Sequence, residues 1–208
     1  MNNLAYNSQD SAVVGPKVEE KIREEVGASA ALPYEVEGAV GAAASAGSIL
    51  RDIGRGLVGG NDETVFRLHF DLQQPRTTHI QINLNRQGVG THAGLVMYST
   101  PINKSIGGEV ELEGPKFFGK SKFTGDSATS AKLNANGDLI KRANDLARVE
   151  SQSGGVTLKI ERCCKVIPHE GGAILVVGTL PRPIKMGFDA TIDAKEFFEV
   201  ANMVEAAL

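Results

Sequence analysis

The residues best suited to chemistry are His69, His79 and Asp71, which lie on two neighbouring segments of alternating apolar and polar residues. Pairing Leu68 with Ile80 in an antiparallel hairpin places His69 directly opposite His79, on the face away from the core. Opposite Cβ atoms are about 4.5–5.5 Å apart, so two imidazoles and a carboxylate could hold a divalent metal ion. The alternative, which we prefer, is an ordinary solvent-facing polar pair, and a register shift of two residues separates the histidines.

A second candidate for chemistry is the segment Gly114–Ser121, which matches the phosphate-loop spacing G-x-x-x-x-G-K-S. A phosphate loop follows an apolar strand and begins a helix, whose N–H groups meet the phosphates. Here the preceding segment is short and charged, Pro115, Phe117 and Phe118 replace small residues, and the residues after Ser121 are poor helix formers. We therefore assign no catalytic residue and no cofactor, and nucleotide hydrolysis stays an alternative.

A stripe of small and apolar residues between positions 36 and 57 predicts an association surface. Its members recur at alternating steps of four and three, which places them on one face of an α-helix. Glycines inside a helix cost about 0.5–1 kcal/mol each relative to alanine, so this helix needs a neighbour. The neighbour we expect is a second copy or another protein; the chain's own body and a membrane surface are alternatives. The stripe consists of Val36, Val40, Ala43, Gly47, Leu50, Gly54 and Leu57.

Composition indicates an ordinary globular chain. Of 208 residues, 41% are hydrophobic and 23% are charged, and the formal net charge is −3, which offers no basic field for nucleic acid. The first residues lack the pattern of a secretory signal, and no apolar run approaches the ~18–20 residues of a membrane span. Cys163 and Cys164 are adjacent, so we expect two reduced thiols, one facing the core and one facing solvent. These features predict a cytoplasmic protein.

The order of hydrophobic periods predicts an α+β fold: N-terminal helices, then a mainly antiparallel β-rich body with a central helical segment and a C-terminal helix. Strands are expected at 64–72, 78–85, 92–100, 109–113, 116–123, 156–167, 173–177 and 185–192, and helical periods at 127–149 and from 194 onward. The expected domains are a mobile tail (1–15), a helical Gly/Ala-rich association segment (16–60) and the α+β body (63–208), whose subdomains would be 63–124 and 125–208.

Several boundary signals accompany these elements. Pro16 predicts the start of the first helix and Gly27 its end. Asn136 and Gly137 predict a break in the central helical segment, and Gly171 lies in a predicted hairpin turn. The capping box D-x-x-E at 193–196 predicts the start of the last helix.

Together these patterns favour a non-enzymatic structural or interaction protein that associates with itself or joins a larger complex. The alternatives are an enzyme, using the 114–121 loop or a metal site at His69 and His79, and a peripheral membrane or lipid-binding module.

Overall fold

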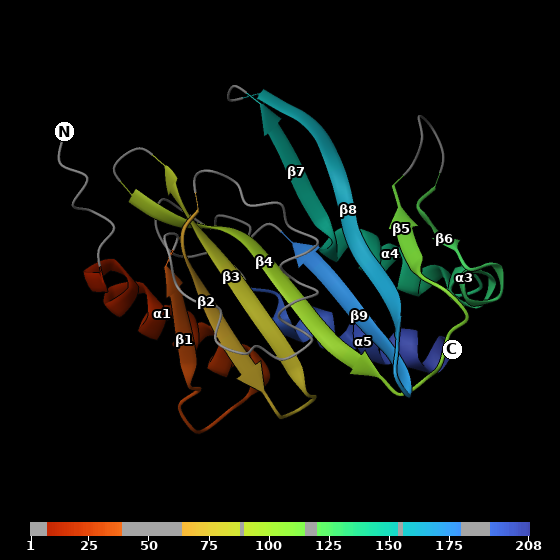
Figure 1. Cartoon of the computed structure of the whole chain (residues 1–208), viewed down its shortest axis with the longest axis horizontal. Helices are drawn as coiled ribbons and strands as arrows, with labels where there is room; N and C mark the ends of the chain where they lie inside the picture. Colours follow the sequence, from red (N-terminus) through yellow and green to blue (C-terminus); the bar gives the residue numbers. More distant parts are fainter. Residues whose placement is uncertain (1–7, 39–63, 88–89, 115–119, 154–155, 180–191) are drawn as a thin grey trace. The chain divides into compact units, whose positions relative to one another are not determined.

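Figure 1 shows the computed structural model, which describes residues 8–38, 64–87, 90–114, 120–153, 156–179 and 192–208. Each strand pair with a defined register is antiparallel. The mixed α+β class with an antiparallel sheet is therefore confirmed. The helices are α1 (Ser8–Val26), α3 (Ser127–Asn134), α4 (Gly137–Leu146) and α5 (Ala194–Ala207), and the strands are β1 (Tyr34–Gly38), β2 (Thr64–Leu72), β3 (Thr78–Gln87), β4 (Gly90–Ile102), β5 (Val110–Glu113), β6 (Lys122–Gly125), β7 (Arg148–Ser153), β8 (Val156–His169) and β9 (Gly172–Thr179).

The chain divides into two compact units. Unit 1 comprises Met1–Met97 and Pro181–Ala194, and unit 2 comprises Tyr98–Leu180 and Lys195–Leu208. The strand order is β1-β2-β3-β4 in unit 1 and β4-β9-β8-β5-β6 in unit 2, with β7 beside β8. The first part of β4 belongs to unit 1 and the second part to unit 2. These boundaries do not coincide with the predicted subdomains 63–124 and 125–208, whose existence stays a prediction.

The core of unit 1 lies on one face of the β2–β3 hairpin. Full burial of one large apolar side chain on this face contributes about 1.5–3 kcal/mol to stability relative to leaving it exposed. Helix α1 lies against β1, where the ring of Tyr34 is 5.3 Å from that of Phe70. A Cβ atom on Gly15 would collide with the Tyr34 ring, so the glycine permits this close approach. The hairpin side chains at most 2% exposed on this face are Leu68, Phe70, Leu72, Ile80 and Ile82.

Helix α1 begins at Ser8, so the predicted start at Pro16 is wrong and residues 8–15 of the expected tail are helical. A residue before proline avoids the helical region because its Cβ meets the proline ring. Gly15 has no Cβ, which eases that clash and lets the helix continue through Pro16. The predicted end is confirmed: Gly27 has φ 70°, and the last carbonyls accept the two hydrogen bonds of a Schellman motif.

The helix predicted to begin at Val36 is wrong for its first residues, because Val36 is in β1 and pairs with Leu68 of β2. Tyr34 and Val36 alternate with Glu35 and Glu37, which is the period of a strand. The other members of the stripe, Val40, Ala43, Gly47, Leu50, Gly54 and Leu57, lie outside the described residues. In the part of the chain that the structure describes, no helix is long and apolar enough to cross a membrane.

The core of unit 2 lies around β9 and α5. The prediction that 173–177 is a strand covered on both faces is confirmed, since each residue from Ala173 to Thr179 is buried. From α5, Phe197 stacks on Tyr98 of β4, with ring centroids 4.7 Å apart. Strand β7 occupies residues where the sequence indicated the end of a helical segment and a turn. It is mostly polar, as strands with one strand neighbour often are.

The central helical segment forms as predicted, with a break between α3 and α4. Asn136 caps α4 by accepting a hydrogen bond from the Leu139 N–H. Strand β6 begins at Lys122 rather than at 116, and residues 115–119 lie outside the description. The strand expected at 185–192 falls almost wholly on residues that the structure does not describe.

The capping box expected at the start of α5 is wrong. Glu196 should reach back toward Asp193, but its carboxylate instead accepts two hydrogen bonds from Arg142 Nη1, at 2.8 and 3.1 Å. Asp193 has φ 58°, the left-handed region rather than the extended backbone usual for a helix cap. Within unit 1, Glu25 of α1 receives the Ala194 N–H at 2.7 Å, which places a carboxylate at the start of α5.

We expect Asp126 to make helix α3 sensitive to acid. Its Oδ2 accepts hydrogen bonds from the hydroxyl and, with a smaller effect, from the N–H of Thr129, which lower the Asp126 pKa below its ordinary value of 3.8. A carboxyl group whose pKa is lower in the folded state stabilises the fold at pH values above its unfolded-state pKa. This stability is lost as the pH falls through the folded-state pKa. We expect Asp126→Asn to remove this part of the melting-temperature decrease below about pH 4. Circular dichroism melts at pH 2 to 6 measure it. Glu170→Gln, at an exposed turn, is the control and should follow the wild type; identical curves for Asp126→Asn and wild type would contradict the prediction.

Candidate functional site

The register of the β2–β3 hairpin differs by two residues from the predicted one. Leu68 pairs with Ile82 rather than Ile80, so His69 lies opposite Gln81, and His79 lies opposite Asp71. The two histidines are therefore diagonal neighbours, and the prediction that they face each other directly is wrong. Diagonal neighbours on one face are still within reach of long side chains, and the two imidazoles remain in contact.

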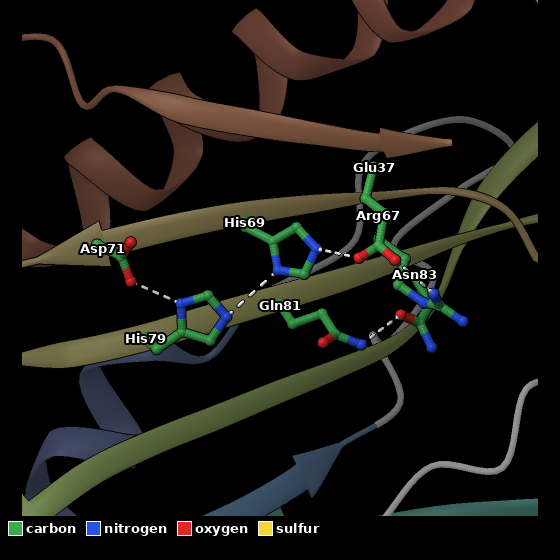
Figure 2. A network of polar contacts seen from close by, with 7 residues as sticks. All are labelled: Glu37, Arg67, His69, Asp71, His79, Gln81 and Asn83. Carbon is green, nitrogen blue, oxygen red and sulfur yellow. Dashed lines mark hydrogen bonds and ion pairs between the residues drawn. The ribbon is translucent and has the colours of Figure 1, made fainter. Parts of the chain in front are cut away.

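Four side chains of unit 1 form a continuous chain of polar contacts, which we name the carboxylate–histidine chain: Asp71, His79, His69 and Glu37 (Figure 2). Asp71 Oδ1 lies 2.6 Å from His79 Nδ1. His79 Nε2 lies 3.3 Å from His69 Nδ1, and His69 Nε2 lies 3.0 Å from Glu37 Oε2. The carboxylate–histidine chain starts at Asp71 on β2, crosses to His79 on β3, returns to His69 on β2 and ends at Glu37 on β1.

The ends of this chain differ from its centre in exposure. The side chains of His69 and His79 are each 2% exposed, so the predicted solvent-facing pair is wrong. At one end Asp71 is 51% exposed. At the other end Glu37 is 19% exposed, and its Oε1 also accepts a hydrogen bond from Arg67 Nη1 at 3.3 Å. The buried rings thus have one carboxylate open to water and one held by an arginine.

The same buried face continues along β3 as amide side chains. Gln81 and Asn83 are 2% and 4% exposed, and Gln81 Nε2 donates a hydrogen bond to Asn83 Oδ1 at 2.9 Å. Gln81 Oε1 accepts no hydrogen bond from the described residues. The alternation of the hairpin separates this polar face from the apolar face that holds Leu68 and Phe70.

The geometry does not form the metal site considered from the sequence. Asp71 contacts Nδ1 of His79, whereas His69 faces the other ring nitrogen, Nε2. The two nitrogens of one imidazole point in divergent directions, so Asp71 cannot join the two histidines around a single ion. Among the residues that the structure describes, no group of three His, Cys, Asp or Glu could hold a metal ion.

The phosphate-loop alternative lacks the local structure it needs. Ser121 is followed by strand β6 instead of a helix, and its hydroxyl donates a hydrogen bond to Asn144 Oδ1 at 2.6 Å. A helix beginning at the Lys-Ser pair is what would present N–H groups to a phosphate. Residues 115–119 of this loop lie outside the description.

Two other sequence features have the predicted placement. Cys163 and Cys164 are free thiols on β8; Cys164 is fully buried and Cys163 is partly exposed. Burial raises the pKa of the Cys164 thiol far above its ordinary range, with smaller contributions from Cys163 and Glu111. Gly171 adopts φ 77° in the tight turn between β8 and β9, as a hairpin turn requires.

Glu37 and Arg67 are not among the site residues predicted from the sequence. Glu37 lies in the segment predicted to be a helix from position 36, although the alternation of Tyr34 and Val36 with acidic residues indicates a strand. Arg67 lies on the polar side of a correctly predicted strand, and its neighbour in β1 could not be identified without β1.

No protein-family model, curated protein or solved structure matches the chain.

Proposed function

We propose that the chain is a non-enzymatic interaction protein that pairs with a second copy of itself along the outer edge of β1. The observation that supports this proposal is the exposure of Val36. Its side chain is 47% exposed, and it is the one exposed large hydrophobic residue that the described part of the chain contains. Val36 is also the central residue of β1, whose strand neighbour in the described sheet is β2. An edge strand of this kind is a template for strand pairing.

A two-fold axis at Val36 would pair β1 with its copy in antiparallel orientation. Val36 would then contact its counterpart, which buries both exposed side chains in an isologous interface. Glu35 would lie opposite the Glu37 of the second copy, and like charges directly opposite each other are destabilising. Within its own chain, however, Glu37 contacts Arg67 Nη1 and His69 Nε2. These contacts reduce the repulsion.

The proposed dimer is weak, because a five-residue strand buries less area than the about 1,200–2,000 Å² of a stable interface. The segment that follows β1 in the sequence contains the rest of the small-residue stripe predicted for association. The proposal retains the cytoplasmic location expected from the sequence. The enzymatic alternatives have less support, because the rings of His69 and His79 are closed to a substrate at 2% exposure.

Sedimentation equilibrium of the full chain over a wide concentration range tests this proposal. We expect a concentration-dependent dimer that Val36→Lys abolishes, since the two-fold axis would bring two ammonium groups together. Glu170→Gln makes the same change in net charge at an exposed turn of unit 2 and should leave dimerisation unchanged. Val36→Thr keeps the β-branched shape and should weaken dimerisation only partly. A wild-type monomer at every concentration, or equal dimerisation of Val36→Lys, would refute the proposal.

A further inference from the structure

The carboxylate–histidine chain contains more contacts than two neutral histidines can satisfy. Each of its three contacts joins two atoms that carry lone pairs, so each needs one proton between them. A neutral imidazole has a single N–H, and two neutral rings therefore supply two protons. The third proton must reside on an imidazole, which becomes an imidazolium, or on a carboxyl group.

The basicity of imidazole favours the imidazolium, because an ordinary imidazole has a pKa of about 6.5 and an ordinary carboxyl group one of about 4. With both carboxylates ionised, Asp71 and Glu37 carry two negative charges, and Arg67 carries one positive charge. One added proton brings the sum over Asp71, Glu37, Arg67 and the two rings to zero. Removal of that proton would leave two neutral rings, each 2% exposed, with two N–H groups for three contacts. Glu35 of β1 lies opposite His69 in the strand register and adds a further negative charge.

We infer that His69 and His79 form a buried proton-binding site that holds one proton shared between the two rings, with Asp71 as its connection to solvent. In one arrangement His79 donates to Asp71 and His69 carries both N–H groups, donating to His79 and Glu37. In the other, His79 carries both N–H groups, and His69 donates to Glu37 and accepts from His79. Transfer of one proton along the 3.3 Å contact between the rings interconverts the two.

The shared proton also attaches β1 to β2. Glu37 belongs to β1, and its Oε2 contacts His69 Nε2 of β2. When a base in solvent removes the proton through Asp71, two neutral rings remain. If His79 still donates to Asp71 and His69 to His79, the lone pair of His69 Nε2 then faces that of Glu37 Oε2. This repulsion weakens one side-chain contact between the strands, while the contact of Glu37 with Arg67 remains.

The test is nitrogen-15 NMR of the imidazole rings in the full chain, at about pH 7.5, where an ordinary histidine is about nine-tenths neutral. We expect the wild-type pair to show one imidazolium equivalent spread over the two rings. In Glu37→Gln the amide donates to His69 Nε2, so two neutral rings satisfy all three contacts. The imidazolium signal should disappear, and both rings should be protonated at Nδ1.

Asp71→Asn is the matched variant at the other end of the chain. Its amide donates to His79 Nδ1, so the imidazolium should again disappear, but both rings should now be protonated at Nε2. His169, the exposed last residue of β8, is the internal control and should give the same signals in all three proteins. Two neutral wild-type rings at this pH, or the same tautomers in both variants, would overturn the inference. The readout is independent of dimerisation, so it can succeed or fail whatever sedimentation shows.

Discussion

Replacing Phe197 with alanine should lower the free energy of unfolding of unit 2 by about 3–5 kcal/mol, the range for truncating a buried phenylalanine. Phe197 of α5 is 0% exposed. Its ring centroid lies 4.7 Å from that of Tyr98, on which the ring stacks, and 5.9 Å from that of Phe198. The substitution removes the apolar area and leaves a cavity between α5 and β4. Neighbouring buried residues of α5, Val200 and Ala201, cannot fill it without displacing the helix.

Urea unfolding of the full chain, followed by circular dichroism and by amide exchange of unit 2, measures this loss. Phe197→Leu keeps part of the volume and should cost less than the alanine variant. Lys195→Ala, at an exposed position of the same helix, should change the free energy of unfolding by at most about 0.5 kcal/mol. A loss below about 1 kcal/mol for Phe197→Ala would mean that the α5 contact does not hold unit 2 together.

Gly125→Ala should lower the free energy of unfolding by the second largest amount, after Phe197→Ala. Gly125 ends β6 with φ 116°, a conformation that side-chain-bearing residues rarely adopt, and a Cβ there would collide with the carbonyl oxygen of Glu109. That same oxygen accepts the Asp126 N–H at 3.1 Å, directly before α3. Backbone strain and overpacking together should lower the free energy of unfolding by about 2–4 kcal/mol.

Gly137→Ala is the matched control, because the chain offers a second glycine with the opposite environment. A Cβ on Gly137 would meet nothing within 4 Å, and this residue begins α4. Alanine there should be neutral or raise the free energy of unfolding by up to about 1 kcal/mol. Thermal melts of both variants compare the two signs. Similar destabilisation by both substitutions would show that loss of glycine flexibility, rather than the Glu109 contact, is responsible.

The hairpin shows what an alternating pattern can and cannot predict. Alternation identified both strands and the apolar face, because residues two apart share a side of a strand. A register shift of two residues keeps every side chain on its face, so the pattern does not distinguish Ile80 from Ile82 as the partner of Leu68. The loop decides, since the strands close with Leu72 opposite Thr78. The contact partners of the histidines therefore could not be predicted from the pattern.

The alternating pattern also did not predict burial of the polar face of the β2–β3 hairpin, because polar residues in such a pattern are taken to face solvent. A buried polar face is acceptable when its groups bond to one another, and that depends on tertiary structure. The composition of the face carried one usable signal. His69, His79, Gln81 and Asn83 are groups that bond readily to each other, whereas a solvated strand face commonly carries lysine. The helix break at Asn136 was predictable because its signal is local in sequence.

The contact of Glu25 with the start of α5 implies an order of assembly. Its carboxylate receives the N–H groups of Ile192 and Ala194, and all three residues belong to unit 1. During synthesis the residues of α1 emerge early, whereas these two N–H groups emerge only after the entire 98–180 segment of unit 2. Domains commonly fold from the N-terminus as the chain is made. The contact of Glu25 with Ile192 and Ala194 instead forms only after most of unit 2 has been synthesised. A nascent chain shorter than 192 residues would therefore leave the Glu25 carboxylate without those two donors.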